Sequence, residues 1–148
     1  MKKLMTTIIA LTLSILFIST AQARNTRYLL PINAALSSSE MAGKLDGSVK
    51  FYFGNQRHPR VLQDVGVYVV NPKTNSIGKS DLRACNWVFL SALVALQKHA
   101  KEAGANAVIN TVSYYKKNEM SSATQYECHA GAMMAGVALK GDLVKVAR

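Results

Sequence analysis

The sequence predicts an α+β domain, in which an antiparallel sheet of about four or five strands carries one long helix on one face and one disulfide. Three observations lead to this fold class. Apolar residues recur at three- and four-residue steps over residues 82–103, which is typical of a helix lying on a core. Shorter segments rich in β-branched and aromatic residues flank that helix, as strands do. Only two cysteines are present, Cys85 and Cys128, and the first falls on the predicted helix.

The first 23 residues have the pattern of a cleaved secretory signal. Lys2 and Lys3 precede an apolar run over residues 4–18, and small residues then lead to Ala23. We therefore expect cleavage after Ala23, with a single domain over residues 24–148 that is exported beyond the inner membrane, into the periplasm or out of the cell. The alternative is that the run remains as a membrane anchor, although it is shorter than the ~20 residues that usually span a bilayer. No cysteine follows the run, which disfavours a lipoprotein, and no integral membrane anchor is expected after cleavage.

Residues 24–47 are expected to form an irregular lead-in with one short helical turn. Ser37 stands three residues before Glu40, the spacing of a capping box, and Gly43 can end the turn. The apolar residues expected to hold this segment on the core are Leu29, Leu30 and Ile32.

Two strands are predicted next. Over residues 48–53, Val49, Phe51 and Phe53 alternate with polar neighbours and Tyr52, which predicts a half-buried strand. Residues 65–70 form the second, which the following Asn-Pro pair ends.

The long helix is expected over residues 82–103. Ser80 or Asp81 can cap its start, and Gly104 can end it. Its predicted buried stripe consists of Leu82, Cys85, Phe89, Leu93, Leu96 and Ala100.

The chain after the helix is expected to complete the sheet. Residues 105–115 are rich in Val, Ile, Thr and Tyr and predict a third strand, and residues 116–122 predict a polar turn. Residues 125–128 and 132–146 are expected to form a bent or bulged return. The glycines expected at its bends are Gly131, Gly136 and Gly141.

The two cysteines favour a disulfide. In an oxidising compartment an even pair in a small domain is most simply one bridge, Cys85 to Cys128. Closing a loop of 43 residues would stabilise the fold by up to about 4 kcal/mol in the chain-entropy model. The alternative is a metal site that includes His129, but a closed zinc site needs four ligands, commonly in paired spacing, and no such pair occurs. No metal or other cofactor is expected.

The domain is basic. Residues 24–148 hold 16 Lys and Arg against 8 Asp and Glu, a formal net charge of +8. Beyond the inner membrane such a surface attracts anionic lipid headgroups, lipopolysaccharide phosphates or acidic wall polymers, and nucleic acid is not an expected partner. The alternative is that the charge only keeps a small protein soluble, since the basic residues are scattered along the sequence.

Two segments carry a family likeness. Residues 91–97 with residues 100–108 resemble the helix-to-strand segment of the small YbjQ-type domains, which the periplasmic domain of the Rcs envelope-stress sensor lipoprotein shares. Residues 131–139 are similar to the closing strand of that group. The most specific part is the Gly-Ala-Asn-Ala-Val element at 104–108, which ends a helix and starts a buried strand. The resemblance implies an α+β fold and no catalytic chemistry.

The whole chain also resembles short exported bacterial proteins whose names often mention an excinuclease ATPase subunit. We interpret that name as an error. Gly78, Lys79 and Ser80 match the end of a phosphate-binding loop, but Lys73 stands where its first glycine is required. Helix capping is the favoured role of this segment. The Rcs sensor's lipid-bearing cysteine has no counterpart here, so its signalling role is not implied.

Aromatic and basic residues supply the candidate interaction surface, which consists of Tyr52, Tyr114, Tyr115, Lys116 and Lys117. The alternative is that such aromatics fill the core and its rim. The three histidines, His58, His99 and His129, accompany no nucleophile motif, so no catalytic residue is assigned.

The expected function is therefore a non-enzymatic periplasmic binding domain with a basic surface for an envelope component or protein partner. The alternative is a hydrolase or metal-handling protein with an unrecognised site.

Overall fold

The computed structural model describes residues 23–39 and 43–148, so the predicted signal over residues 1–23 lies almost wholly outside the described residues. Eight strands, two α-helices and one 3-10 turn make up this part of the chain. Their bounds, in chain order, are β1 Thr26–Pro31, α2 Ile32–Leu36, β2 Lys50–Phe53, β3 Val61–Val70, β4 Lys73–Asn75, α3 Asp81–Glu102, β5 Ala107–Ser113, η3 Tyr115–Lys117, β6 Gln125–Ala130, β7 Met134–Gly136 and β8 Leu139–Val146.

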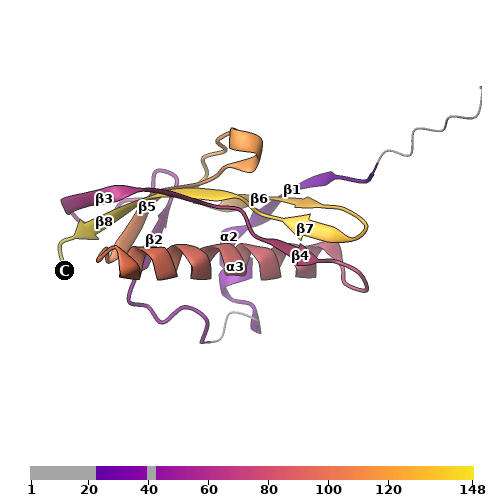
Figure 1. The fold of residues 1–148 in the computed structure, drawn as a ribbon, viewed down its shortest axis with the longest axis horizontal. Coiled ribbons are helices and arrows are strands. Elements are labelled where there is room, and N and C mark those ends of the chain that lie inside the picture. The colour runs from indigo at the N-terminus through magenta and orange to yellow at the C-terminus, as the bar shows by residue number, and fades with distance from the viewer. Residues whose placement is uncertain (1–22, 40–42) are drawn as a thin grey trace, which may run out of the picture.

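The strands form two four-stranded sheets, with α3 running along one side of both (Figure 1). The first has the order β1-β6-β7-β4 and the second β2-β5-β8-β3. The α+β class, the long helix and its position are confirmed. The prediction of a single antiparallel sheet is wrong in two respects, because the strands divide into two sheets and β2 pairs with β5 in parallel.

The division follows from two breaks in the chain. Asn71 and Pro72 end β3 at Val70, as the sequence predicts, and the chain continues as β4, so that β3 joins the second sheet and β4 the first. Val137 and Ala138 likewise separate β7 from β8. The segments 61–75 and 134–146 therefore each cross from one sheet to the other. The alternation of apolar and polar residues within a single strand does not predict such a crossing.

The N-terminal segment is a strand, where an irregular lead-in was expected. Residues Thr26 to Pro31 pair antiparallel with β6, from Thr26 opposite Ala130 to Pro31 opposite Gln125. Ile32 is buried and Leu30 packs against the core as expected, but Leu29 is exposed. Ser37 is the C-cap of α2, so the described helical turn precedes Ser37, and Glu40 of the expected capping box lies outside the described residues.

Helix α3 begins and ends with the predicted signals. The Ser80 hydroxyl accepts a hydrogen bond from the Arg83 backbone N–H at 3.2 Å and so caps the start. Gly104, at φ +75°, supplies the left-handed residue of a Schellman motif, in which the Ala105 N–H donates to the Ala100 carbonyl at 2.8 Å. These residues belong to the element on which the YbjQ-type resemblance rests.

The main core lies between α3 and the two sheets. The predicted helical stripe is buried except for Leu82, which is exposed in the first turn of α3. A smaller cluster around Ala107, Ile109 and Val144 lies apart from the main core, and Tyr52 packs against it. Gly141 does not form a bend: it lies within β8, where a Cβ would stand 2.4 Å from the Val108 Cγ1 atom.

Candidate functional site

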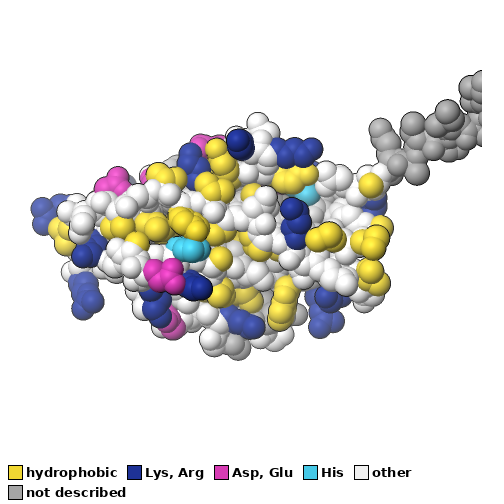
Figure 2. Space-filling view, in the orientation of Figure 1, with side chains coloured by type: hydrophobic (Ala, Val, Ile, Leu, Met, Phe, Trp, Pro, Cys, Tyr) yellow, Lys and Arg dark blue, Asp and Glu magenta, His cyan; other side chains and the backbone are white. Residues whose placement is uncertain are grey.

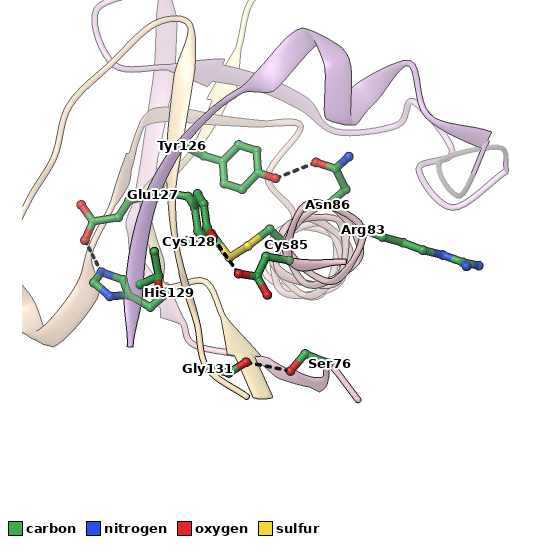
Figure 3. Close-up of a disulfide and its surroundings, with 12 residues drawn as sticks. Ser76, Arg83, Cys85, Asn86, Tyr126, Glu127, Cys128, His129 and Gly131 are labelled. Atoms are coloured by element: carbon green, nitrogen blue, oxygen red, sulfur yellow. Dashed lines mark hydrogen bonds and ion pairs between the residues drawn. A yellow bond between two sulfur atoms is a disulfide. The ribbon is translucent and has the colours of Figure 1, made fainter. Parts of the chain in front are cut away.

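The disulfide joins the first turn of α3 to β6. Cys85 and Cys128 have Cα atoms 5.8 Å apart, and both residues are fully buried. Figure 3 shows the bridge between the helix and the strand, with Tyr126 beside it. The predicted pairing is confirmed. Because the two sulfur atoms are bonded to each other and shielded from solvent, the cysteines act as a structural link rather than as metal ligands or an exchangeable pair.

An aromatic pair packs beside the disulfide. The rings of Phe89 and Tyr126 lie nearly parallel, with centroids 3.9 Å apart. The Tyr126 hydroxyl donates to Asn86 Oδ1 at 2.7 Å, and burial raises the pKa of this phenol well above its ordinary value. Tyr126 therefore stays neutral and anchors β6 to α3.

A polar cluster covers the other face of β6. Arg27 donates to Glu127 at 2.9 Å, and His129 Nε2 lies 2.7 Å from the other carboxylate oxygen of Glu127. Burial raises the pKa of Glu127, but the hydrogen bonds from Arg27 and His129 outweigh it, so the net pKa lies below the ordinary value. Asn25 Oδ1 lies 3.2 Å from His129 Nδ1, and its Nδ2 donates to the Tyr115 hydroxyl at 3.0 Å.

Hydrogen bonds and ring stacking hold the side chains of this cluster in place. Both ring nitrogens of His129 face oxygen acceptors, and both carboxylate oxygens of Glu127 are bound. The Tyr115 ring lies parallel to the imidazole with centroids 3.4 Å apart. These contacts fix the orientation of the imidazole between Glu127 and Asn25.

The predicted interaction residues after β5 form a tight turn. Lys116 and Lys117 have φ values of 50° and 65°, which are left-handed backbone conformations. Both side chains are exposed. The Lys116 ammonium lies 5.5 Å from the Tyr115 ring centroid, and the Lys140 ammonium lies 5.2 Å from that of Tyr114. The four consecutive residues 114–117 therefore lie together on one turn.

Tyr52 lies apart from that turn. It stands on β2 in the second sheet, where its ring meets the His58 ring edge-on with centroids 5.8 Å apart. It lines a hollow of about 450 Å³ that none of the turn residues reaches. The predicted interaction surface is thus divided between two places.

The surface around Tyr52 is strongly basic. Four exposed side chains stand at this end of the second sheet, and we call them the basic edge: Lys50, Arg60, Lys145 and Arg148. Lys50 and Arg148 line the hollow with Tyr52, and Lys145 and Arg148 line a neighbouring hollow of about 340 Å³. Among the residues that the structure describes, no acidic side chain lines either of these two hollows.

The basic edge arises from sheet topology. The strands β2, β3 and β5 all begin at this end, and β8 ends there, since Val61 pairs with Val146 and Ala107 with Val144. The Ala147 N–H donates to the Arg60 carbonyl at 3.0 Å, which brings the start of β3 to the end of the chain. Figure 2 shows Lys and Arg side chains at this end of the molecule. Sequence reasoning missed the cluster because its members are spread from position 50 to position 148.

Two further properties concern the described part of the chain. In residues 23–39 and 43–148, no three His, Cys, Asp or Glu side chains are grouped so as to hold a metal ion. None of the helices in these same ranges has the length and apolar character needed to cross a bilayer.

The chain matches no protein-family model, no curated protein and no solved structure.

Proposed function

We propose that the protein is an exported, non-enzymatic binding module whose basic edge holds an anionic polymer of the cell envelope. Export rests on the signal pattern of residues 1–23, and the buried disulfide is compatible with it. The observation that carries the binding proposal is that Lys50, Lys145 and Arg148 line two adjoining hollows in which the described residues include no acidic side chain.

The distribution of carboxylates supports this choice of surface. Several acidic side chains on other surfaces bind basic partners: Glu127 binds Arg27 at 2.9 Å, and Glu119 binds Lys140. Asp46, which lies closest in sequence to the hollow, binds Lys101 at 2.6 Å. Because these three carboxylates are bound to basic partners, they do not oppose an anion at the basic edge, although exposed basic side chains such as Lys73 and Lys79 also lie elsewhere.

The form of the surface also suits a polymer. The two hollows share Asn106, Val146 and Arg148 in their linings, so they are continuous along the end of the sheet. Tyr52 adds a half-exposed aromatic ring on which a sugar or other flat group can rest. A repeating anion can therefore contact several basic side chains at once, which strengthens weak individual contacts.

The test is binding of purified residues 24–148 to lipopolysaccharide, teichoic acid and alginate, which separates phosphate-bearing from carboxylate-bearing polymers. The test variant combines Lys50→Gln, Arg60→Gln and Lys145→Gln. The matched control combines Lys98→Gln, Lys116→Gln and Lys117→Gln, which removes the same charge from other surfaces, including the tyrosine turn.

We expect the test variant to bind at least one of these polymers about 100-fold more weakly, at about 1 kcal/mol per basic contact, and the control to bind within a few-fold of the natural chain. Added salt should weaken the natural interaction. Equal losses in both variants, or a larger loss in the control, would refute the assignment to the basic edge.

A further inference from the structure

The end of the molecule opposite the basic edge carries exposed apolar side chains on two loops. Ile77 is 59% exposed in the loop that leads into α3, and Met133 is 66% exposed between β6 and β7. Leu82 and Met134, which stand beside these two, are also more than half exposed. We call these four residues the apolar end. Figure 2 shows hydrophobic side chains at the end away from β3 and β8.

Hydrogen bonds hold the two loops together. The Ser76 N–H donates to the Met133 carbonyl at 2.9 Å, and the Ser76 hydroxyl donates to the Gly131 carbonyl at 3.2 Å, as Figure 3 shows for the second contact. Arg24 donates to the same Gly131 carbonyl at 2.8 Å. The apolar side chains therefore project from a fixed base.

Basic residues surround the apolar end. Lys73 and Arg24 line a hollow of about 370 Å³ together with Met133 and Met134. Lys79 is exposed in the same loop as Ile77. The nearby carboxylate of Asp81 is bound through both of its oxygens by Arg24, so it does not oppose an anionic partner. Apolar tips within a basic rim match the layers of a phospholipid surface, in which phosphates lie outside acyl chains.

The chain also enters the fold at this end. Ala23 lines the same hollow as Met133, and in the sequence the apolar run 4–18 ends five residues before Ala23. Five extended residues reach at most about 18 Å. Whenever that run is inserted in a bilayer, the apolar end is consequently held close to the membrane surface.

We infer that the apolar end docks peripherally on a phospholipid bilayer, with Ile77, Met133 and Met134 entering the boundary between headgroups and acyl chains. Lys73 and Lys79 then lie level with the lipid phosphates. This inference goes beyond the proposed function, because it concerns another surface and another ligand.

The test is flotation of residues 24–148 with vesicles of phosphatidylethanolamine and phosphatidylglycerol, and separately with vesicles of phosphatidylcholine alone. The test variant is Ile77→Ser with Met133→Ser. The matched control is Leu62→Ser with Val67→Ser, which removes two side chains of similar exposure, 58% and 59%, from β3. Thermal unfolding of each variant establishes that it is folded.

We expect the natural chain to float with both kinds of vesicle, and the test variant to partition about 30-fold less, because it loses two side chains that would each leave water by about half. The control should partition within twofold of the natural chain. The basic-edge variant should still bind phosphatidylcholine vesicles, so failure of this inference and failure of the proposed function are separable.

Three outcomes would overturn the inference. One is absence of flotation for the natural chain. Another is an equal loss in the test variant and the Leu62/Val67 control. The third is a dimer of the natural chain in sedimentation that Ile77→Ser with Met133→Ser dissociates without any vesicle binding, which would make the apolar end a contact between copies.

Discussion

The guanidinium of Arg24 donates to both carboxylate oxygens of Asp81, at 2.6 and 3.0 Å. Asp81 is the first residue of α3, and its Oδ2 atom also accepts from the Tyr28 hydroxyl at 2.7 Å. Residues from the start of the described chain are thereby fixed to the N-terminus of the long helix, 57 positions away in sequence. The negative charge also suits the positive end of the helix dipole.

The Arg24–Asp81 contact predicts a stability that depends on pH. Hydrogen bonds from Arg24 and then Tyr28 lower the pKa of Asp81 from 3.8 to about 2. A carboxyl group whose pKa is lower in the folded state stabilises the fold above its unfolded pKa and loses that contribution as the pH falls through the folded pKa. We therefore expect Asp81→Asn to lower Tm by a few degrees at pH 7 and to have little effect near pH 2. Thermal melts of the natural chain and the variant between pH 2 and pH 7 measure this difference in Tm.

The control for this pH series is Asp64→Asn, whose carboxylate accepts only the Gly66 backbone N–H among the contacts described here. Its Tm difference from the natural chain should stay small at every pH. A difference between Asp81→Asn and the natural chain that is the same at pH 7 and pH 2 would contradict the assigned role of the charge.

Removing the Cys85–Cys128 disulfide is expected to lower the stability of the fold strongly. Replacing Cys85 and Cys128 together by alanine releases a loop of 43 residues, which should lower the free energy of unfolding by about 3 to 4 kcal/mol. Urea denaturation of the natural chain and the variant measures the difference. Reductant should lower the stability of the natural chain and leave that of the double variant unchanged; an effect on the double variant would assign the loss to another cause.

Close packing at Gly141 predicts that Gly141→Ala destabilises the fold and that a second substitution, Val108→Ala, reduces this loss. In Gly141→Ala the new Cβ would stand 2.4 Å from the Val108 Cγ1 atom, and forcing the two strands apart should cost about 2 kcal/mol. Val108→Ala removes the obstructing methyl groups. The double variant should therefore be more stable than the sum of the two single losses predicts, and additive losses in a double-mutant cycle would contradict the contact.

The hydrogen bond between the buried Tyr126 hydroxyl and Asn86 predicts different losses of stability for Tyr126→Phe and Asn86→Ala. Tyr126→Phe removes only the hydroxyl and retains the stack on Phe89, so it should cost about 1 kcal/mol. Asn86→Ala leaves the buried hydroxyl without its acceptor and should cost more. In the Tyr126→Phe background, Asn86→Ala should have little further effect. Equal and additive costs in urea denaturation would show that the hydrogen bond contributes nothing.

The parts of the fold that depend on local sequence were predictable. The helix α3 follows from a run of apolar residues at helical spacing, a capping Ser80 and a terminating Gly104, all within about 25 positions of one another. The disulfide was predictable because two cysteines allow only one pairing. The signal sequence and cleavage after Ala23 stay predictions.

The parts that depend on pairing between distant segments were not predictable. Residues 26–31 form β1 only because β6, about 100 positions later, offers an edge to pair with, and the lead-in has weak alternation of its own. The parallel pairing of β2 with β5 likewise depends on the path of the chain through α3. The basic edge has the same origin, since Lys50, Arg60 and Lys145 meet only when their strands are placed side by side.

The length of helix α3 sets the distance between the apolar end and the basic edge. Its first residue, Asp81, stands at the apolar end, and Gly104, just past its last turn, lines a hollow of the basic edge. Twenty-two helical residues span about 33 Å. If the molecule stands on its apolar end with α3 upright on a bilayer, this length places Tyr52 and its basic neighbours well clear of the headgroups.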